Sequence, residues 1–447
     1  MPVILFQNAQ IVTMNAQREI VRGDLRVRDD RIAAIGSMGK ALPARDPVAD
    51  RVIDASGWVL LPGFVQAHVH LCQTLFRNQA EDMELLDWLQ KKIWPLEAAH
   101  DEHSMRVSAR LGIAELLAGG TTTILDMGSV HHYDAVFEEL EKSGLRAAGG
   151  KCMMDAGDHL PAGLRETASS SLQMSRGLME RWHGAANGRL RYAFAPRFAL
   201  SCSEALLREV AEISSATGCL VHTHASENLN ETRLVQQRSG RRNVEYLASL
   251  GIWGRRACLA HCIHLDENEI ALMAREHTGV AHCPGSNLKL GSGIAPVARL
   301  RQAGVVVGLG ADGAPCNNSL DQLHEMRLAA LLQKIASGVS ALPAQAVVEM
   351  ATIEGARCLG WEGEIGSLEE GKKADVIAID LERVSLMPVS DIYTTIVYAA
   401  RSSDVALTMV DGRILFERGE SGRMDMAALA AEAPQEFLRV AERADIK

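Results

Sequence analysis

The chain has 447 residues, of which 47% are hydrophobic and 23% are charged, and its formal net charge is -10. These values are close to a globular average and exclude a disordered chain. The acidic balance leaves no broad basic surface to neutralise phosphates, so nucleic acids and anionic membranes are excluded as partner classes. Small neutral or cationic substrates are favoured.

The start of the chain, MPVILFQNAQIVTMNAQRE, has no basic segment before its apolar run and soon becomes polar, so it does not fit a signal peptide. No apolar run in the sequence approaches the length of a membrane span. The nine cysteines include no CxxC pair, and we expect them to be buried, reduced thiols. These features together predict a cytoplasmic protein.

Both ends of the chain alternate between apolar and polar residues as β-strands do. At the N-terminal end the pattern covers ILFQNAQIVT, GDLRVRDDRIAAIG and RVIDASGWVLLPG, and at the C-terminal end ADVIAIDL and ALTMVDGRILFERGE. We therefore predict a small composite β-sandwich domain from residues 1–60 and 370–447, with a helix at its C-terminal end.

The middle of the chain, residues 61–369, alternates short apolar runs with longer helical patterns. Strands are predicted at GFVQAHV, TTTILDM, RAAGGKCMMD, LRYAFAP, CLVHTHA, ACLAHC, GVAHCP and VVVGLGAD, and helices separate them, for example at 104–120, 203–218 and 295–304. Eight such units predict an α/β fold of the (β/α)₈ TIM-barrel class. An open doubly wound sheet is the alternative, but the sequence has neither GxGxxG after the first strand nor a Walker loop.

Two histidines, His68 and His70, end the first predicted barrel strand. Side chains two residues apart on a strand point to the same side, so this pair could chelate one ion. Other predicted strands also end in potential ligands or acid–base groups. The C-terminal ends of barrel strands converge on one face, where the catalytic residues of this fold lie. The residues expected at that face are His68, His70, His224, Glu227, His261 and Asp312.

Some neighbouring residues offer alternatives to this set. His222 lies two residues before His224 and would share its face, so either could be the ligand; we favour His224, which is nearer the strand exit. Cys258, Cys262 and Cys283 suggest a zinc–thiolate site, but the CxxxC spacing of the first two within one strand would splay the thiols. We therefore expect histidine and carboxylate ligands.

Three imidazoles and one carboxylate, from His68, His70, His224 and Asp312, can bind one Zn²⁺ or Fe²⁺ and leave a position for water. Zinc lowers the pKa of such a water to about 7 and so provides a nucleophile at neutral pH. A binuclear site would favour a lysine at the end of strand four, where the chain has Arg197, so we predict a mononuclear site.

Attack on an aromatic carbon that carries an amino group requires several proton transfers. Glu227 and Asp312 can divide this work between them. His261 can hydrogen-bond the attacking hydroxide and stabilise the tetrahedral centre. The sequence therefore predicts Glu227, His261 and Asp312 as catalytic residues.

The chain resembles the amidohydrolase superfamily over nearly its whole length, in the branch of metal-dependent aminohydrolases and triazine chlorohydrolases. The motifs that carry this resemblance are LPGFVQAHVH, HTHASE, LAHC, SNLKLGSGIAP, GADGAPCNNSLDQLHEMRLAALLQK, MATIEGAR and IGSLEEGKKADVIAID. The resemblance implies the same metal ligands, with Glu227 as the proton shuttle, and Zn²⁺ as the most common ion, with Fe²⁺ as the alternative. It also implies a homo-oligomer.

Within that branch, the motifs are most similar to deaminases of S-adenosylhomocysteine, 5'-methylthioadenosine and 5'-deoxyadenosine. Glu97 then matches the carboxylate that binds ribose hydroxyls, and Lys151 stands where an arginine is usual. HVHLCQ and APRFALSCS instead resemble guanine deaminase, which implies purine contacts by Gln73, Arg197 and Phe198. We predict an adenine-nucleoside deaminase. The alternatives are deamination of guanine, an oxidised guanine or a pterin, and amino- or chlorohydrolysis of an s-triazine.

Overall fold

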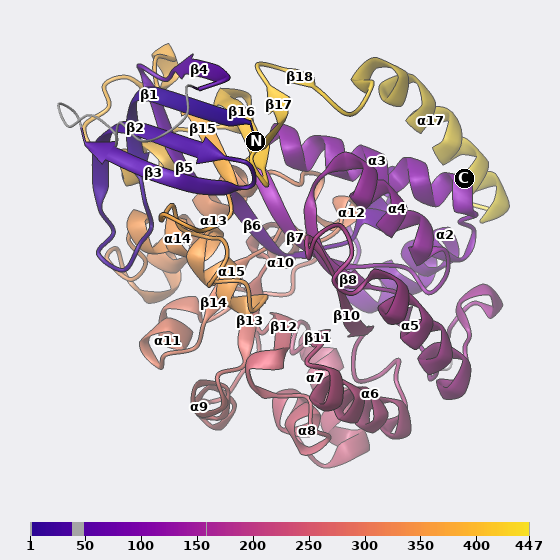
Figure 1. Ribbon diagram of the computed structural model, residues 1–447. Coiled ribbons are helices and arrows are strands. Elements are labelled where there is room, and N and C mark those ends of the chain that lie inside the picture. The colour runs from indigo at the N-terminus through magenta and orange to yellow at the C-terminus, as the bar shows by residue number, and fades with distance from the viewer. Residues whose placement is uncertain (1, 38–48, 158, 447) are drawn as a thin grey trace.

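The computed structural model describes residues 2–37, 49–157 and 159–446. Its strands form two sheets (Figure 1). The chain passes from the first sheet to the second between residues 62 and 64, and it returns to the first sheet between residues 309 and 376. Within the described residues, no helix is both long enough and apolar enough to cross a membrane.

The larger sheet is a closed barrel of eight parallel strands, as the sequence predicted. Each strand pairs with the next, and the pairing of Ala193 with Leu220 closes the ring. The strands, in their order around the barrel, are β6 (Phe64–Val69), β7 (Thr121–Met127), β8 (Arg146–Gly150), β10 (Leu190–Pro196), β11 (Leu220–Ala225), β12 (Ala257–His261), β13 (Gly279–His282) and β14 (Val307–Leu309); the short β9 (Cys152–Met153) extends β8 along β10.

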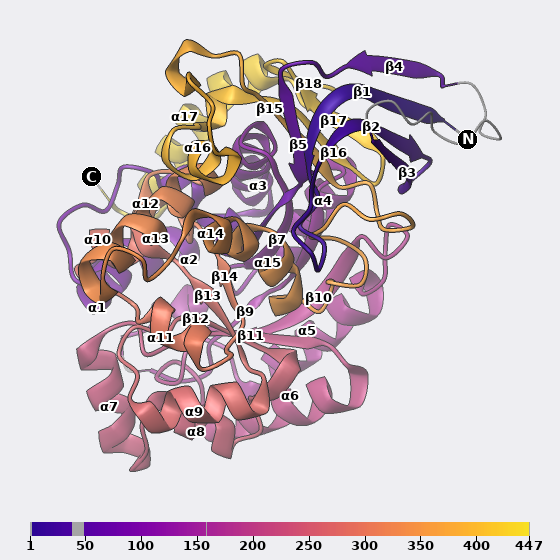
Figure 2. The ribbon, with the colours of Figure 1, turned by 90° about the vertical axis from the view of Figure 1, so that its left-hand side faces the viewer.

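Helices follow each barrel strand and form the outer layer, so this part of the chain has the (β/α)₈ architecture (Figures 1 and 2). The predicted helices at 104–120, 203–218 and 295–304 correspond to α3, α6 and α11. The main outer helices are α3 (Glu102–Ala118), α4 (Tyr133–Ser143), α5 (Ala168–Trp182), α6 (Glu204–Thr217), α7 (Leu229–Ser239), α8 (Asn243–Ser249), α9 (Glu267–Glu276), α11 (Val297–Gln302), α13 (Gln322–Ser337), α14 (Ala344–Ala351) and α15 (Ile353–Cys358).

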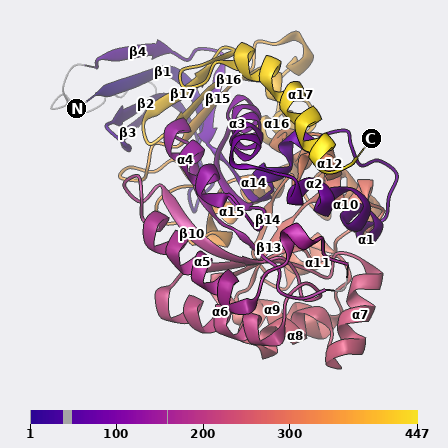
Figure 3. The same cartoon turned by 90° about the vertical axis from the view of Figure 1, so that its right-hand side faces the viewer.

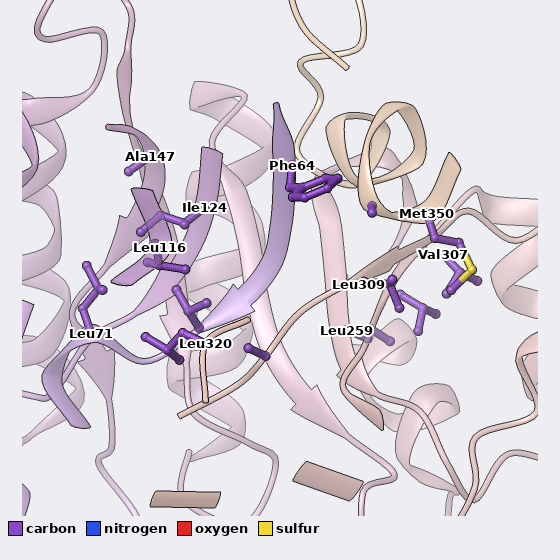
Figure 4. Close-up of a cluster of buried hydrophobic side chains, with 14 of the residues drawn as sticks. Phe64, Leu71, Leu116, Ile124, Ala147, Leu259, Val307, Leu309, Leu320 and Met350 are labelled. Atoms are coloured by element: carbon purple, nitrogen blue, oxygen red, sulfur yellow. The ribbon is translucent and has the colours of Figure 1, made fainter. Parts of the chain in front are cut away.

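Apolar side chains fill the space between the barrel strands and these helices (Figure 4). Phe64, Ile124, Leu259 and Val307 come from four different strands and are buried. A parallel strand that is covered by helices outside and by the barrel core inside is buried on both faces, so its sequence is almost continuously apolar. This explains why short apolar runs located the strands.

The second sheet is built from both ends of the chain. In sequence order its strands are β1 (Val3–Val12), β2 (Ile20–Arg28), β3 (Arg31–Ser37), β4 (Arg51–Asp54), β5 (Trp58–Pro62), β15 (Val376–Asp380), β16 (Val405–Val410), β17 (Arg413–Glu417) and β18 (Glu420–Ser421). The two ends meet where β5 pairs antiparallel with β15. The sheet has its own apolar core, which includes Phe6, Leu25 and Leu407. The limits of 1–60 and 370–447 remain a sequence-based prediction.

Several short helices and one long C-terminal helix complete the fold. The last helix, α17 (Met426–Arg443), packs against α3 on the barrel (Figure 3). Between β6 and α3 the chain forms η1 (Leu71–Phe76), α1 (Leu85–Trp88), the π-helical turn η2 (Leu89–Ile93) and α2 (Trp94–Ala98); α10 (Pro284–Lys289), α12 (Ala314–Asn317) and α16 (Ile392–Tyr398) are short.

A buried ion pair connects the barrel to the composite sheet. Arg146, the first residue of β8, donates from Nε to Asp375 Oδ2 at 2.7 Å, and its guanidinium also contacts Asp411. Both Arg146 and Asp375 are buried, so neither charge is solvated by water. Removing one partner of such a pair leaves an uncompensated charge in the interior.

We therefore expect Arg146→Met to lower the free energy of unfolding by about 3–5 kcal/mol. The exposed pair of Arg275 and Glu276 provides the control, and Arg275→Met should cost less than about 1 kcal/mol. Denaturant unfolding of both variants measures the difference. Equal losses would contradict a structural role for the buried pair.

Candidate metal centre and active site

Five of the predicted site residues meet at the C-terminal end of the barrel. His68 lies in β6, His224 in β11 and His261 at the end of β12, while His70 and Asp312 follow β6 and β14. One ligand atom from each of His68, His224, His261 and Asp312 lies within 4.8 Å of the others. Strand ends that are far apart in the sequence thus place their side chains around one point.

The distances within this cluster fit a small divalent ion. His70 Nε2 lies 3.2 Å from His224 Nε2 and 3.3 Å from Asp312 Oδ1, and His68 Nε2 lies 3.1 Å from the same oxygen. Ligand atoms that lie about 2.0–2.2 Å from one zinc ion, at angles of about 90–110° to one another, are separated by about 2.8–3.6 Å, and this spacing leaves room for a fifth, water ligand. His261 Nε2 lies farther away, 3.8 Å from Asp312 Oδ2. These distances favour His68, His70, His224 and Asp312 as the ligand set.

Hydrogen bonds fix the orientation of two of these imidazoles. His70 Nδ1 lies 2.7 Å from the carbonyl oxygen of Met127, and His224 Nδ1 lies 2.6 Å from that of Arg197. A carbonyl oxygen can only accept, so each Nδ1 carries the proton and each Nε2 keeps its lone pair. A metal ion that binds through Nε2 requires this tautomer. The carbonyl oxygens act as the hydrogen-bond partners that metal-binding histidines usually have on the nitrogen away from the ion.

His68 is oriented through a second histidine. His222 Nδ1 lies 2.9 Å from the carbonyl oxygen of Cys258 and therefore donates to it, which leaves His222 Nε2 as the acceptor for His68 Nδ1 at 2.6 Å. Both nitrogens of His222 are thus engaged. His68 Nδ1 therefore carries the proton, and His68 Nε2 keeps its lone pair and lies 3.1 Å from Asp312 Oδ1. The structure therefore gives His222 a supporting position and leaves His68 and His224 facing the cluster.

Burial keeps these side chains in the neutral form that binds metal. Burial and then the nearby His68 lower the pKa of His70 to about 3, and burial also lowers the pKa of His224 well below the usual histidine value. Uncharged imidazoles with free Nε2 atoms are ligands ready for a cation. The donor set fits one divalent ion, with a carboxylate that offsets part of its charge.

Two residues of the cluster adopt a backbone conformation that non-glycine residues rarely use. His261 has φ 71° and Asp312 has φ 64°. Such residues persist only where the surroundings hold them, and they cluster at functional sites. The approach of β14 to β6 requires Gly310, because a Cβ there would lie 2.5 Å from the His68 carbonyl oxygen. Asp312 N then donates to that same oxygen at 3.1 Å.

Glu227 lies beside the cluster, on the loop before α7. Its Oε2 is 3.5 Å from His261 Nε2, and burial raises the pKa of Glu227 to about 7. His261 Nδ1 in turn lies 2.8 Å from Asn287 Oδ1. Burial lowers the pKa of His261, but the facing Glu227 and Asp312 carboxylates more than offset this and leave its pKa raised. The pair therefore combines a proton carrier with a polarised hydrogen-bond donor.

The predicted substrate residues Gln73, Glu97 and Arg197 form one buried network. Arg197 donates to both carboxylate oxygens of Glu97, at 2.6 and 3.2 Å, and Gln73 Nε2 donates to Glu97 Oε1 at 2.8 Å. Gln73, Arg197 and Phe198 line the pocket beside the metal cluster, whereas Glu97 lies behind them. In this arrangement Glu97 orients Arg197 and Gln73.

Lys151 is not brought to the pocket. Its ammonium is fully buried and contacts Glu166, Ser171 Oγ and the carbonyl oxygen of Cys152. Glu166 Oε2 also accepts a hydrogen bond from the backbone N–H of Met154. The Lys151–Glu166 pair therefore joins the two ends of the loop that connects these residues. Lys151 thus stabilises this loop through Glu166, and it is not among the residues that line the pocket.

Several lining residues were missed by sequence reasoning. Glu231 accepts from the backbone N–H of Glu227 at 2.9 Å and so holds the proton carrier in place. Its place three residues after Asn228, the N-cap of α7, is that of a capping box and was an available signal. The others are apolar side chains whose helical spacing is that of any core residue: Leu85, Trp88, Leu89 and Leu290.

We expect His224→Ala to weaken zinc binding by more than about 100-fold, because it removes a ligand. His222→Ala should weaken binding by about 10–100-fold, because His68 loses its orienting partner. Competition with a chromogenic zinc chelator measures both affinities, and His324→Ala, on the exposed face of α13, is the control. An affinity of His222→Ala equal to the control would contradict the supporting role.

Known proteins are similar to this chain over almost its whole length. The chain is 40% identical to a 5-methylthioadenosine/S-adenosylhomocysteine deaminase of Moorella thermoacetica, covering 96% of this chain and 97% of that protein. It is also 40% identical to a 5'-deoxyadenosine deaminase of Methanothermobacter thermautotrophicus, covering 90% and 91%. The crystal structure of an adenosine deaminase from Xanthomonas campestris with bound zinc superposes with a TM-score of 0.92 at 31% identity, covering 98% of both chains.

The Amidohydrolase family matches residues 59–415, which include the whole barrel and all but the first residue of the strand β5 that leads into it. All the residues of the metal cluster lie within this range. The chain therefore belongs to the amidohydrolase family.

Proposed function

We propose that the protein is a metal-dependent hydrolytic deaminase of an adenine-type nucleoside, of the 5'-deoxyadenosine, 5'-methylthioadenosine or S-adenosylhomocysteine class. Water and the 6-aminopurine would give the 6-oxopurine and ammonia. The observation that carries the proposal is the convergence of three oriented imidazoles, Asp312 and Glu227 on one pocket. The sequence similarity to deaminases of these nucleosides supports the substrate class.

We assign one divalent ion, Zn²⁺ in the first place, to His68, His70, His224 and Asp312. When bound, such an ion lowers the pKa of a water molecule to about 7 and polarises it for attack. The zinc in the similar Xanthomonas campestris structure supports this choice of ion. The interatomic distances in the cluster support a single ion, because four ligand atoms already surround one point.

Glu227 is the proton carrier in this proposal. Its pKa of about 7 allows it to accept a proton from the attacking water and then give it to a ring nitrogen of the purine at neutral pH. The backbone N–H of Glu227 is held by Glu231, so the carboxyl group stays at the pocket wall. His261 stabilises the attacking oxygen by a hydrogen bond. Asp312 takes the second proton of the former water from the oxygen that is now bonded to the ring carbon, and passes it to the amino group, which leaves as ammonia.

The rest of the pocket binds and orients the base. Phe198 supplies an apolar wall, and Gln73 and Arg197 supply polar atoms that Glu97 holds in place. The orientation of the Gln73 amide follows from chemistry, because Glu97 can only accept and therefore requires the NH₂ group. Gln73 Oε1 has no hydrogen-bond partner among the described residues and remains as an acceptor for the ligand.

A panel of possible substrates tests the proposed class directly. It contains 5'-deoxyadenosine, 5'-methylthioadenosine, S-adenosylhomocysteine, adenosine, guanine, 8-oxoguanine, a pterin and a chlorinated s-triazine. We expect ammonia release to be fastest with one of the adenine nucleosides. Preferred turnover of a free base or a triazine, measured as ammonia or chloride release, would contradict the nucleoside proposal while leaving the hydrolase assignment intact.

Replacing the proton carrier should separate metal binding from catalysis. Glu227→Gln keeps the shape of the side chain and removes its acid–base function, so we expect full zinc content and a kcat about 10²–10⁴-fold lower. Metal analysis and steady-state kinetics on the best substrate measure the two effects. Glu204→Gln on the exposed face of α6 is the control, and a normal kcat for Glu227→Gln would exclude it as the shuttle.

A further inference from the structure

The last helix of the chain, α17, packs against the segment that carries part of the pocket wall. Figures 1 and 3 both show α17 along α3, with α2 near its C-terminal end. One buried apolar cluster joins these elements, and its members are Leu429, Ala433 and Val440 of α17, Leu75 and Phe76 of η1, Leu96 of α2, and Val107 and Ala114 of α3. Gln73 of η1 lines the pocket and is bound by Glu97 of α2. The helix α17 thus supports this wall, although none of its described residues lines the pocket.

The peptide unit between Cys72 and Gln73 is held at both of its polar ends. The backbone N–H of Gln73 donates to the carbonyl oxygen of His70 at 3.0 Å. The carbonyl oxygen of Cys72 accepts a hydrogen bond from Nε2 of His100 at 2.8 Å. Because a peptide unit is planar, these two contacts hold the backbone from which the Gln73 side chain leaves. The space for that side chain is narrow, since a Cβ at Gly313 would lie 2.1 Å from Gln73 Oε1.

The tautomer of His100 follows from its partners. A carbonyl oxygen can only accept, so Nε2 carries the proton and Nδ1 is left as an acceptor. Nδ1 lies 2.9 Å from Ser104 Oγ, which therefore donates to it. Burial lowers the pKa of His100 to about 4, so the ring is neutral near pH 7. It also stacks on Phe76, with 4.9 Å between the ring centroids. Both ring nitrogens are therefore engaged, and neither is available to a ligand.

Arg443, the last residue of α17, binds the turn that contains His100. Its Nε donates to the carbonyl oxygen of Ala99 at 2.8 Å, and its Nη2 donates to Ser104 Oγ at 3.3 Å. Its Nη1 also lies 3.1 Å from Asp101 Oδ2. Ser104 Oγ accepts from Arg443 and donates to His100. A continuous series of hydrogen bonds therefore leads from α17 to the backbone of η1.

We propose that His100 is a positioning residue for Gln73, and that α17 keeps His100 in place through Arg443 and Ser104. The end of the chain then sets how well the pocket binds the base without touching it. This inference rests on the proposed function, in which Gln73 Oε1 is an acceptor for the ligand. A contact of this kind is made in the bound substrate as well as in the transition state, so its loss should raise KM more than it lowers kcat.

Two substitutions of His100 keep different halves of its hydrogen bonding. The amide nitrogen of glutamine can take the place of Nε2 and donate to the Cys72 carbonyl oxygen, whereas asparagine reaches only the position of Nδ1. We expect His100→Asn to raise KM for the best adenine nucleoside by about 10-fold, with kcat within about 3-fold of the wild type. His100→Gln should restore KM to within about 3-fold. Steady-state ammonia release measures both variants, and equal KM values for them would overturn the proposal.

A double-mutant cycle tests whether His100 acts through Gln73. Gln73→Met keeps the length of the side chain and removes its amide. In that background His100→Asn should change kcat/KM by less than about 2-fold, because the amide that it positions is absent. Zinc content should stay at one ion per chain in each variant. An additive loss, or a loss of zinc in parallel with activity, would show that His100 supports the fold or the metal site instead, and the proposal would be wrong.

Two arginines of α17 provide a matched pair at the surface, which remains informative if a substitution of the buried His100 prevents folding. Arg443→Met removes the hydrogen bonds to Ala99 and Ser104, and we expect KM to rise by about 5-fold. Arg439, one turn earlier, has a 58% exposed side chain that binds Glu436 of the same helix. Arg439→Met should leave KM within about 2-fold of the wild type. Equal KM values for these two variants would contradict the role of α17.

The wild-type enzyme separates this inference from the proposed function. If the wild type releases no ammonia from any adenine nucleoside, the proposed function fails, and the role of His100 in nucleoside binding fails with it. If the wild type is active but His100→Asn and His100→Gln have the same KM, the failure concerns His100 alone. All the measurements use the zinc-loaded, full-length protein.

Discussion

The metal cluster depends on hydrogen bonds that fix which nitrogen of each imidazole carries a proton. His70 and His224 each give the Nδ1 proton to a backbone carbonyl oxygen, and His68 gives its own to His222. The free nitrogens of all three rings then face the same point. In the other tautomer, the proton would lie on the nitrogen that faces the ion and would block metal binding. Because these rings are buried, no water could replace the hydrogen bond that Nδ1 would lose.

The barrel makes this arrangement possible because it brings sequence-distant strand ends to one rim. The three carbonyl acceptors lie on the strands next to those of the histidines that they orient: Met127 ends β7, Arg197 follows β10 and Cys258 lies in β12. The closed barrel therefore positions both the ligands and the carbonyl groups that orient them. The composite sheet lies away from this rim and is joined to the barrel through Arg146 at the start of β8, so its connection does not interrupt the site.

The fold and the convergence of the predicted cluster residues on one end of the barrel could be predicted from the sequence for physical reasons. Strands covered on both faces must be apolar, so eight short apolar runs marked the barrel. The spacing of His68 and His70 on a strand placed both on one side, and Asp312 was marked by its position at the end of the last run. The supporting role of His222 needed coordinates, because it depends on Cys258, which is close in space and 36 residues away in sequence.

Other parts of the pocket could not be predicted. Leu85, Trp88 and Leu89 have the spacing of an ordinary apolar helix face, and nothing in that pattern distinguishes a pocket lining from a core contact. The pairing of Arg197 with Glu97 joins residues 100 positions apart, and Lys151 finds its partner in a loop acid, Glu166. Such contacts depend on the paths that the loops take across the barrel rim. The spacing of apolar residues in the sequence does not predict these paths.

The chemical identity of the metal ligands is the point on which the functional assignment depends most. X-ray absorption at the zinc edge of the zinc-loaded protein measures them directly. The proposed site predicts one ion per chain, with nitrogen and oxygen neighbours at about 2.0–2.2 Å. A shell of sulfur neighbours at about 2.3 Å would instead show that zinc binds cysteine thiolates, and it would contradict the assignment to His68, His70, His224 and Asp312.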